Sequence, residues 1–592
     1  MIEFVTNSFV PIMFTGLLVF LLTGFPVAFA LAATGLFFGF IGMELGLFPS
    51  NLFQALPLRV FGIMQNDTLL AIPFFTLMGI ILERSRMAED LLETVGQVFG
   101  PLRGGVGIAV ILVGALLAAT TGVVAASVIS MGLIAMPIML RYGYNRSIAT
   151  GTITASGTLA QALPPSLVLI VLADQLGRSV GDMYAGALLP GLMLVGLYLV
   201  FIIVVAFVKP SWVPALPPEA RIYNEANGSS GHRSLLVLML LAGGCAWAWS
   251  SVHESIINPW VGRDGPAAND EVFILSTTIG AFVALGFALI NKFTRAGLLS
   301  RLTERVTFVL IPPLVLIFLV LGTIFLGIAT PTEGGAMGAI GALLMAGARR
   351  TLSMDLLKQA MENSTKLSIF VMFILIGSTV FSFTFNAADG HIWVEHLFDK
   401  LPGGQLGFLL FVNLLVFILG MFIDFFEIAF IVVPLLAPVA EKLDINLIWF
   451  GIILAMNLQT SFLTPPFGFA LFYLRSVAAR QDYTDKVTGA RIPAVTTLQI
   501  YKGSIAFIVL QLIMVAVIVF NPTLVTGNLD KAVVVDDATV SDMLVRRATT
   551  CRVWRVMLQA KHHKMHPPAP TACPHRPLKR PRSTQPKHCW NR

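Results

Sequence analysis

Two polar segments of this chain carry side chains that could bind a small cation. The first, Thr154-Ala-Ser-Gly-Thr158, precedes the pair Pro164-Pro165, and the second, Asn457-Leu-Gln-Thr-Ser461, precedes Pro465-Pro466. Proline removes an amide donor and clashes with the preceding helical turn, so each pair should free backbone carbonyls upstream. Carbonyl, hydroxyl and amide oxygens suit a hard cation such as Na⁺, and helix N-termini that point at the same cavity favour an anion. The sequence therefore predicts a site for Na⁺ and an anionic substrate.

These segments lie at matching places of an internal repeat. Setting Pro137 on Pro438 aligns the two Pro-Pro pairs without a gap, at an offset of 301 residues. Two further pairs of segments align at offsets between 299 and 303. Interrupted helices at corresponding places of two halves are typical of the binding site of a secondary transporter. We therefore expect a first half at 1–208 and a second half at 304–520.

The composition indicates that the elements around these segments span a membrane. Of the 592 residues, 56% are hydrophobic and only 12% are charged, whereas soluble proteins have about 25% charged residues. Apolar runs close to 20 residues long can cross the hydrocarbon core. Examples are Leu192–Val208, Phe273–Ile290, Phe308–Leu326, Phe370–Phe385 and Ile505–Phe520. We predict an all-α polytopic membrane protein, and the N-terminus has no basic region or cleavage site typical of a signal peptide.

The positions of Lys and Arg predict the topology, because basic residues favour the cytoplasmic side. Arg103 and Arg141 flank a segment that is too long for one span and has a small, polar centre, so we predict a re-entrant hairpin. The second half repeats the pattern in the opposite orientation, which is an inverted-topology repeat. The expected hairpins lie at about 104–138 and 403–438, and the expected broken helices lie at about 146–173 and 445–474.

Two regions lie outside the repeat. Residues 209–303 contain a polar linker and two extra apolar spans, which are either peripheral or in contact with another subunit. Residues 521–592 form a basic tail that we predict to be disordered, and its Cys and His spacing fits no metal site. From Arg546 onward the tail has 12 Lys and Arg and no acid, so removing it changes the net charge from +7 to −5. Such a tail could contact acidic lipid or RNA, but we expect an extension without a folded role and no nucleic-acid partner.

Acidic residues within membrane segments are costly and are therefore candidates for function. Asp424 and Glu427 lie near the second hairpin tip, where Asp424 could bind a cation or stabilise the tip. Glu333 follows Thr330-Pro-Thr, which favours a capping role, and Asp67 follows a polar loop, which favours the membrane interface. No His or Lys accompanies these acids in the breaks, so the sequence does not favour a pure proton relay.

Several motifs resemble those of the large membrane subunit, DctM type, of TRAP (tripartite ATP-independent periplasmic) transporters. They are Ala71-Ile-Pro-Phe-Phe-Thr-Leu-Met-Gly79, Arg141-Tyr-Gly-Tyr144, Thr154–Ser166, Gly327-Ile-Ala-Thr-Pro-Thr-Glu333, Gly420-Met-Phe-Ile-Asp424 and Leu463-Thr-Pro-Pro-Phe-Gly468. The resemblance covers about 1–210 and 304–520. The first tip, Ala118–Ala126, differs from the Gly- and Ser-rich tip usual in the family and is similar to the branch labelled mannitol/chloroaromatic.

The resemblance implies an elevator-type Na⁺ symporter in a bacterial inner membrane that imports an organic acid. Na⁺ would be the coupling ion, and no organic cofactor is expected. The implied partners are a small four-helix membrane subunit (DctQ type), a periplasmic solute-binding protein and the lipid bilayer. The implied sodium-site residues are Thr120, Gly122, Ser156 and Gly157 in the first half, and Gly420, Asp424, Thr460 and Thr464 in the second. We expect substrate contacts from Thr121, Thr158, Asn457 and Ser461.

Two other classes of function need comparison. A stand-alone ion-coupled carboxylate carrier or exchanger would have the same architecture but need no binding protein. Neighbouring genes for a four-span protein and a secreted binding protein would favour the tripartite system. An intramembrane hydrolase is not supported, because the chain has no HExxH, GxSxG or GxGD motif. No GxxxxGK[ST] loop is present for ATP-driven transport, so we expect a transporter and no enzyme.

Overall fold

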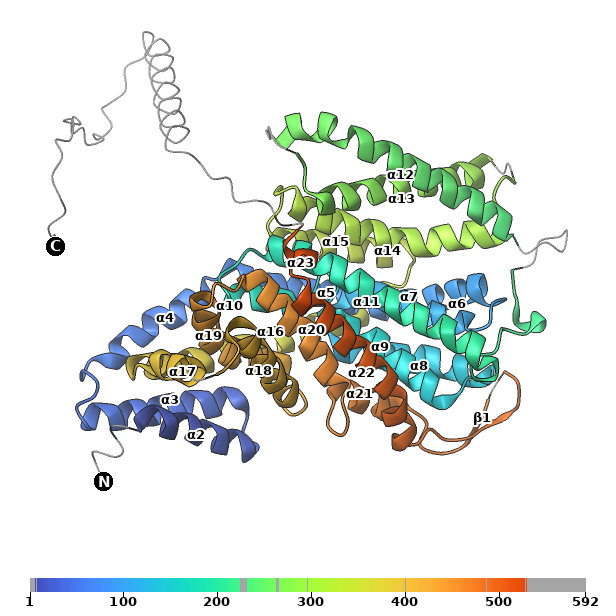
Figure 1. Cartoon of the computed structure of the whole chain (residues 1–592). Coiled ribbons are helices and arrows are strands. Elements are labelled where there is room, and N and C mark those ends of the chain that lie inside the picture. Colours follow the sequence, from blue (N-terminus) through green and yellow to red (C-terminus); the bar gives the residue numbers. More distant parts are fainter. Residues whose placement is uncertain are drawn as a thin grey trace, which may run out of the picture. The chain divides into compact units, whose positions relative to one another are not determined.

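The computed structural model describes residue 6 and residues 8–223, 231–261, 266–294, 297–399, 401–485, 487–527 and 529. These residues form α-helices and one two-stranded antiparallel sheet (Figure 1). In this part of the chain, eight helices are long and apolar enough to cross a membrane, or up to ten if each bent pair forms one span. The predicted all-α polytopic class is confirmed.

The first half consists of α-helices and short 3₁₀ helices, and the last of these form one broken helix followed by one long helix. They are α2 (Phe9–Leu22), α3 (Val27–Glu44), η1 (Leu52–Ala55), α4 (Leu56–Met64), η2 (Asp67–Leu70), α5 (Ala71–Arg84), α6 (Met87–Phe99), α7 (Gly105–Thr121), α8 (Val124–Arg141), α9 (Arg146–Thr158), η3 (Leu159–Gln161), α10 (Leu167–Gln175) and α11 (Val180–Val208). The linker and insertion contain η4 (Pro210–Trp212), η5 (Pro218–Ala220), α12 (His232–Val261) and α13 (Asn269–Thr294).

The second half repeats this order. Its elements are α14 (Arg301–Phe325), α15 (Pro331–Ala348), α16 (Met354–Ala387), α17 (Gly390–Asp399), α18 (Gly404–Leu419), α19 (Phe425–Lys442), α20 (Leu447–Phe462), α21 (Phe469–Val477), β1 (Tyr483–Thr484), β2 (Arg491–Ile492), α22 (Thr497–Phe520) and α23 (Thr523–Thr526). The segments predicted as hairpins correspond to α7–α8 and α18–α19. The predicted broken helices correspond to α9–η3–α10 and α20–α21.

The two halves pack crosswise. Helix α10 packs on α19 of the other half, and its counterpart α21 packs on α8. In the same way α9 packs on α22, and α20 packs on α11. Helix α3 packs on α16, and α5 packs on α15. Each contact therefore recurs with the halves exchanged, as expected for two related halves that bury equivalent apolar faces against each other.

The breaks lie nearer to the prolines than the sequence analysis predicts. Residues 154–158 and 457–461 are still helical, and the chain leaves the helix only at 162–166 and 463–468. Proline mainly disturbs the residue before it and the hydrogen bond to the carbonyl four residues upstream, so the helix persists until about one turn before each pair. The Pro164–Pro165 and Pro465–Pro466 peptide bonds are both cis.

The regions outside the repeat are partly described. Helices α12 and α13 cover the two extra spans, and they pack on each other and on α14 (Figure 1). The predicted tail lies outside the described residues from 530 onward. Its first residues differ from the prediction, because α23 packs on α11 and α20 and Val525 is fully buried. This apolar anchor extends the folded chain to about residue 527.

Candidate functional site

The turn between α7 and α8 lies against the first break. Gly122 forms this turn with a left-handed φ of 61°. A Cβ atom at this position would lie 3.4 Å from the Leu167 backbone nitrogen and 3.8 Å from the Pro165 carbonyl oxygen. The adjacent Thr121 hydroxyl lies 2.7 Å from the Ser127 hydroxyl and joins the two arms of the hairpin. The tip is therefore shorter than predicted, because only residues 122 and 123 leave the helices.

The end of α9 contacts both arms of this hairpin at close range. A Cβ atom at Gly157 would lie 3.0 Å from the Val128 backbone nitrogen, and one at Gly114 would lie 2.7 Å from the Ser156 Oγ. Glycine at both positions allows α9 to approach α7 and α8 this closely. The first-half candidates Thr120, Thr121, Ser156 and Thr158 are all at most 3% exposed. The structure thus brings the first-half residues together in a buried cluster.

The second tip lies against α20 and the second break. A Cβ atom at Gly420 would lie 2.9 Å from the Ser461 Cβ. The rings of Phe422 and Phe467, one from the tip and one from the break, have centroids 5.0 Å apart. The first tip is buried, whereas this second contact lies at the surface, because the Phe422 and Phe467 side chains are 58% and 47% exposed.

Asp424 begins α19 as its N-cap residue. Its Oδ1 accepts a hydrogen bond of 2.7 Å from the Phe425 amide, which stabilises the start of α19, one of the two roles that the sequence left open for Asp424. Only Oδ1 takes part in this bond. Glu427 lies in the first turn of the same helix, where the helix dipole favours negative charge.

The candidate hydroxyl groups share one hydrogen-bonding pattern. Each donates its hydrogen to a carbonyl three or four residues earlier in its own helix and keeps oxygen lone pairs that could face a cation. The acceptors are Leu117 for Thr120 and Thr121, Ile153 for Ser156, Ala155 for Thr158, Met456 for Thr460, Leu458 for Ser461 and Thr460 for Thr464, at 2.8–3.0 Å. Asn457 donates instead to the Asn413 carbonyl on α18 at 2.6 Å.

The two clusters adjoin each other. Both η3 and α10 pack on α20, so the first break lies beside the helix that carries Asn457 and Thr460. Within the described part of the chain, no group of three or more His, Cys, Asp or Glu residues could hold a metal ion.

Four buried polar residues near these clusters are not among the site residues expected from the sequence. Gln161 ends η3, is fully buried, and has no hydrogen-bond partner among the described residues for either side-chain atom. The Tyr198 Oη accepts hydrogen bonds from Gln511 at 2.6 Å and Gln459 at 3.4 Å. The sequence carries one sign that these residues could be functional, because the side-chain amides of Gln161 and Gln511 each interrupt an apolar run.

The two acids outside the tips lie at helix starts. Glu333 accepts a 2.8 Å hydrogen bond from the Thr330 amide, while the Thr330 hydroxyl accepts one from the Glu333 amide. This reciprocal capping box confirms the predicted capping role. Asp67 begins η2, and its carbonyl accepts a hydrogen bond from the Thr332 hydroxyl at 2.6 Å.

Comparison with known proteins identifies the family. The family model described as "Tripartite ATP-independent periplasmic transporter, DctM component" matches residues 14–258 and 271–524. The chain belongs to this family. With its apolar spans, this DctM-family permease is a multi-pass protein of the inner membrane.

Curated relatives of the permease agree with this assignment. A C4-dicarboxylate TRAP transporter large permease protein of Pseudomonas aeruginosa is 26% identical over 432 residues, 73% of this chain and 82% of that protein. The protein of the same name from Rhodobacter capsulatus is 25% identical over 87% of this chain and 98% of its own length. A sialic acid TRAP transporter permease protein of Haemophilus influenzae is 22% identical over 86% of this chain and 66% of its own.

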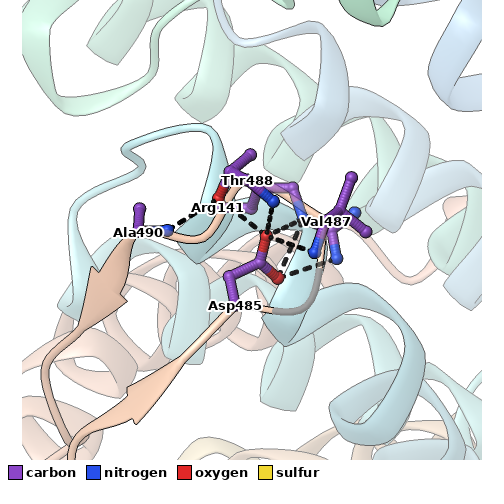
Figure 2. Close-up of polar contacts among 5 residues, drawn as sticks. All are labelled: Arg141, Asp485, Val487, Thr488 and Ala490. Carbon is purple, nitrogen blue, oxygen red and sulfur yellow. Dashed lines mark hydrogen bonds and ion pairs between the residues drawn. The ribbon is translucent and has the colours of Figure 1, made fainter.

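A salt bridge holds the first hairpin of the permease to the loop between α21 and α22. Asp485, which is 4% exposed, lies 2.9 Å from the Arg141 guanidinium at the end of α8 (Figure 2). Its carboxylate also accepts hydrogen bonds from the Thr488 amide and hydroxyl at 2.8 and 2.7 Å. The Arg141 guanidinium and these donors hold the pKa of the Asp485 carboxyl well below its usual range.

We expect Asp485→Ala to loosen this loop. Removing the buried Asp485 carboxylate leaves its hydrogen-bond donors without an acceptor. The loop should then open more often, and we expect trypsin to cleave it at Arg480 or Arg491 roughly tenfold faster. Asp482→Ala is the matched control, because the Asp482–Arg491 pair is 41% and 79% exposed and such pairs contribute little.

Because the pKa of the Asp485 carboxyl is lowered, the stabilisation of the loop by this carboxylate is complete at neutral pH. It is lost only as the pH falls below about 4 toward the lowered pKa. Equal cleavage of the two variants at pH 7 would contradict the anchoring role.

Proposed function

We propose that this permease is a Na⁺-coupled symporter that imports an organic acid delivered by a periplasmic binding protein. The observation that carries the proposal is the meeting of a hairpin tip and a helix break in each half. Each meeting point collects the ends of several helices together with buried hydroxyl groups. Such sites at broken helices bind both the ion and the substrate in secondary transporters.

The helix directions favour a cation and an anion in the same region. Helices α7 and α9 end at the first meeting point, so their unpaired carbonyls carry partial negative charge. Helices α8 and α10 begin there, and the Leu167 amide at the start of α10 lies beside the Gly122 turn. Amides at a helix start favour an anion. In the second half, α18 and α20 end at the meeting point, and α19 and α21 begin there.

The candidate sodium ligands of each half are the hydroxyl and backbone oxygens at its meeting point. In the first half these belong to Thr120, Gly122, Ser156 and Gly157, and in the second to Gly420, Asp424, Thr460 and Thr464. Thr121, Thr158, Asn457 and Ser461 would face the substrate. Na⁺ would be bound and released in each cycle as the coupling ion, so it is a co-substrate rather than a resident cofactor.

Membership of the tripartite family supports a proposal for the partners and the substrate class. We propose a small DctQ-type subunit that holds the permease in the bilayer while the tips and breaks move together as an elevator. The substrate class, a carboxylate, is supported by the C4-dicarboxylate and sialic acid relatives, since both ligands are organic acids. We also propose that the permease belongs to the branch labelled mannitol/chloroaromatic, to which its first tip, Ala118–Ala126, is similar.

The requirement for a binding protein is tested by reconstitution. Liposomes would contain this permease and its small subunit, with the ligand of the cognate binding protein found first by a thermal-shift screen of organic acids. We expect uptake of that acid only when the binding protein is present outside. Equal uptake without it would instead indicate a stand-alone carrier or exchanger.

A further inference from the structure

Gln161 lies in the short helix η3, between the two candidate clusters. Helix η3 packs on both arms of the first hairpin, α7 and α8, and on α20 of the second half. The Gln161 carbonyl accepts a hydrogen bond of 3.1 Å from the Ser166 hydroxyl and so joins the two sides of the first break. Both residues are fully buried. The Gln161 side chain is therefore enclosed where the first hairpin, the first break and α20 adjoin.

The Gln161 amide uses none of its hydrogen-bonding capacity within the fold. Its Nε2 and Oε1 atoms have no hydrogen-bond partner among the described residues, although a glutamine side chain can donate two hydrogen bonds and accept others. A buried amide without partners destabilises a protein, so such a group calls for a partner from outside the fold. Gln511, which is also buried, differs because its amide donates to the Tyr198 hydroxyl at 2.6 Å.

The candidate hydroxyl groups of the first half offer acceptors but no donors. Each of them gives its hydrogen to a carbonyl of its own helix, which leaves only oxygen lone pairs for a ligand. These groups belong to Thr120, Thr121, Ser156 and Thr158. Lone pairs suit a cation, whereas a carboxylate accepts hydrogen bonds and needs N–H or O–H donors. Gln161 adds what these four side chains lack, because its amide hydrogens are still free to be donated.

We propose that the Gln161 amide binds the carboxylate of the transported acid by donating its Nε2 hydrogens. This inference rests on the proposed import of an organic acid and assigns one residue to the recognition of that acid. The start of α10, whose Leu167 amide lies beside the Gly122 turn, favours an anion in the same region. The hydroxyl oxygens nearby remain available as acceptors, either for Na⁺ or for a hydroxyl group of the acid.

Replacing the amide with an apolar side chain of similar length separates this role from a structural one. Methionine is unbranched, like glutamine, and adapts to irregular spaces. Exchanging an unpaired buried amide for an apolar group should be neutral or stabilising. We therefore expect Gln161→Met to unfold at the same temperature as the unmodified permease or at a higher one. The measurement is thermal unfolding of the permease with its small subunit in detergent, without added acid.

Gln511→Met is the matched control for the unfolding measurement. It removes the donor to the Tyr198 hydroxyl and should therefore unfold at a lower temperature than the unmodified permease. If Gln161→Met also unfolds at a lower temperature, or fails to fold, its amide serves the fold and the proposal is wrong.

The affinity for the acid should fall in Gln161→Met although the fold is kept. The probe is the organic acid that the thermal-shift screen selects for the cognate binding protein. Hydrogen bonds to charged groups are strong, so we expect the acid concentration for half-maximal protection against unfolding to rise roughly 10- to 100-fold. The Na⁺ concentration for half-maximal uptake at saturating acid should not change, because Nε2 has no lone pair for a cation. A shifted Na⁺ titration with unchanged acid affinity would make Gln161 a sodium ligand and overturn the proposal.

A failure of this inference can be told apart from a failure of the proposed function. If the unmodified permease takes up the acid with Na⁺ and Gln161→Met binds the acid equally well, only the role of Gln161 is excluded. If the unmodified permease shows no Na⁺-driven uptake, the proposed function itself fails. In that case, protection by the acid that is lost in Gln161→Met would still assign the acid site to this residue.

Discussion

Gly157→Val is expected to abolish uptake while leaving the permease folded in the membrane. The added Cβ would lie 3.0 Å from the nitrogen and 3.1 Å from the Cα of Val128. Both are backbone atoms that cannot rotate away, so α8 must move and displace the tip from the end of α9. Misplacing a binding group by about 1 Å can cost roughly 100-fold in rate, and we expect a loss of at least this size.

The control for this prediction is a valine at an unconstrained helical glycine. Gly196 lies in α11, and a Cβ atom there would have nothing within 4 Å. Initial uptake rates would be compared at equal amounts of folded protein, measured by fluorescence-detected gel filtration. If Gly157→Val transports as well as Gly196→Val, the close contact between α8 and α9 is not required for transport.

Asp424→Asn is expected to raise the Na⁺ concentration for half-maximal uptake by roughly tenfold or more. Two unit charges 4 Å apart interact by about 4 kcal/mol at an effective dielectric constant of 20, and a loss of one third of that energy is about tenfold in affinity. Asparagine keeps an oxygen that can accept the hydrogen bond from the Phe425 amide. The substitution therefore removes the charge and preserves the helix cap.

A second acid separates a local effect from a general loss of charge. Glu333→Gln changes a carboxylate that caps α15, and its Na⁺ titration should equal that of the unmodified permease. Asp424→Ala, which removes both charge and cap, should be worse than Asp424→Asn. An unchanged titration in folded Asp424→Asn would exclude Asp424 as a sodium ligand and leave it only the capping role.

Local sequence chemistry predicts the elements of the site well. The paired prolines indicate two interrupted helices, and the structure has a break at each pair. The small, polar stretch at Ala118–Ala126 indicates a turn between two apolar arms, and Gly122 makes that turn. The exact extent of each break could not be predicted, because the hydroxyl groups of Ser156 and Thr158 bond to their own helix and support it up to the proline.

Contacts between distant residues could not be predicted. Arg141 and Asp485 are 344 positions apart, and neither is unusual among the charged residues of its loop. The burial of Gln161 and the shared Tyr198 hydroxyl depend on which helix faces meet, and the nearly uniform apolar character of the spans hides this from the sequence.

Sodium-driven uptake in proteoliposomes tests the central claim most directly. The permease, its small subunit and the liganded binding protein would be assembled with equal pH on both sides and K⁺ in place of Na⁺ as the control salt. We predict accumulation of the organic acid under an inward Na⁺ gradient and none under the K⁺ gradient. Equal accumulation in Na⁺-free buffer would contradict the proposal that the two tip-and-break clusters bind the coupling ion.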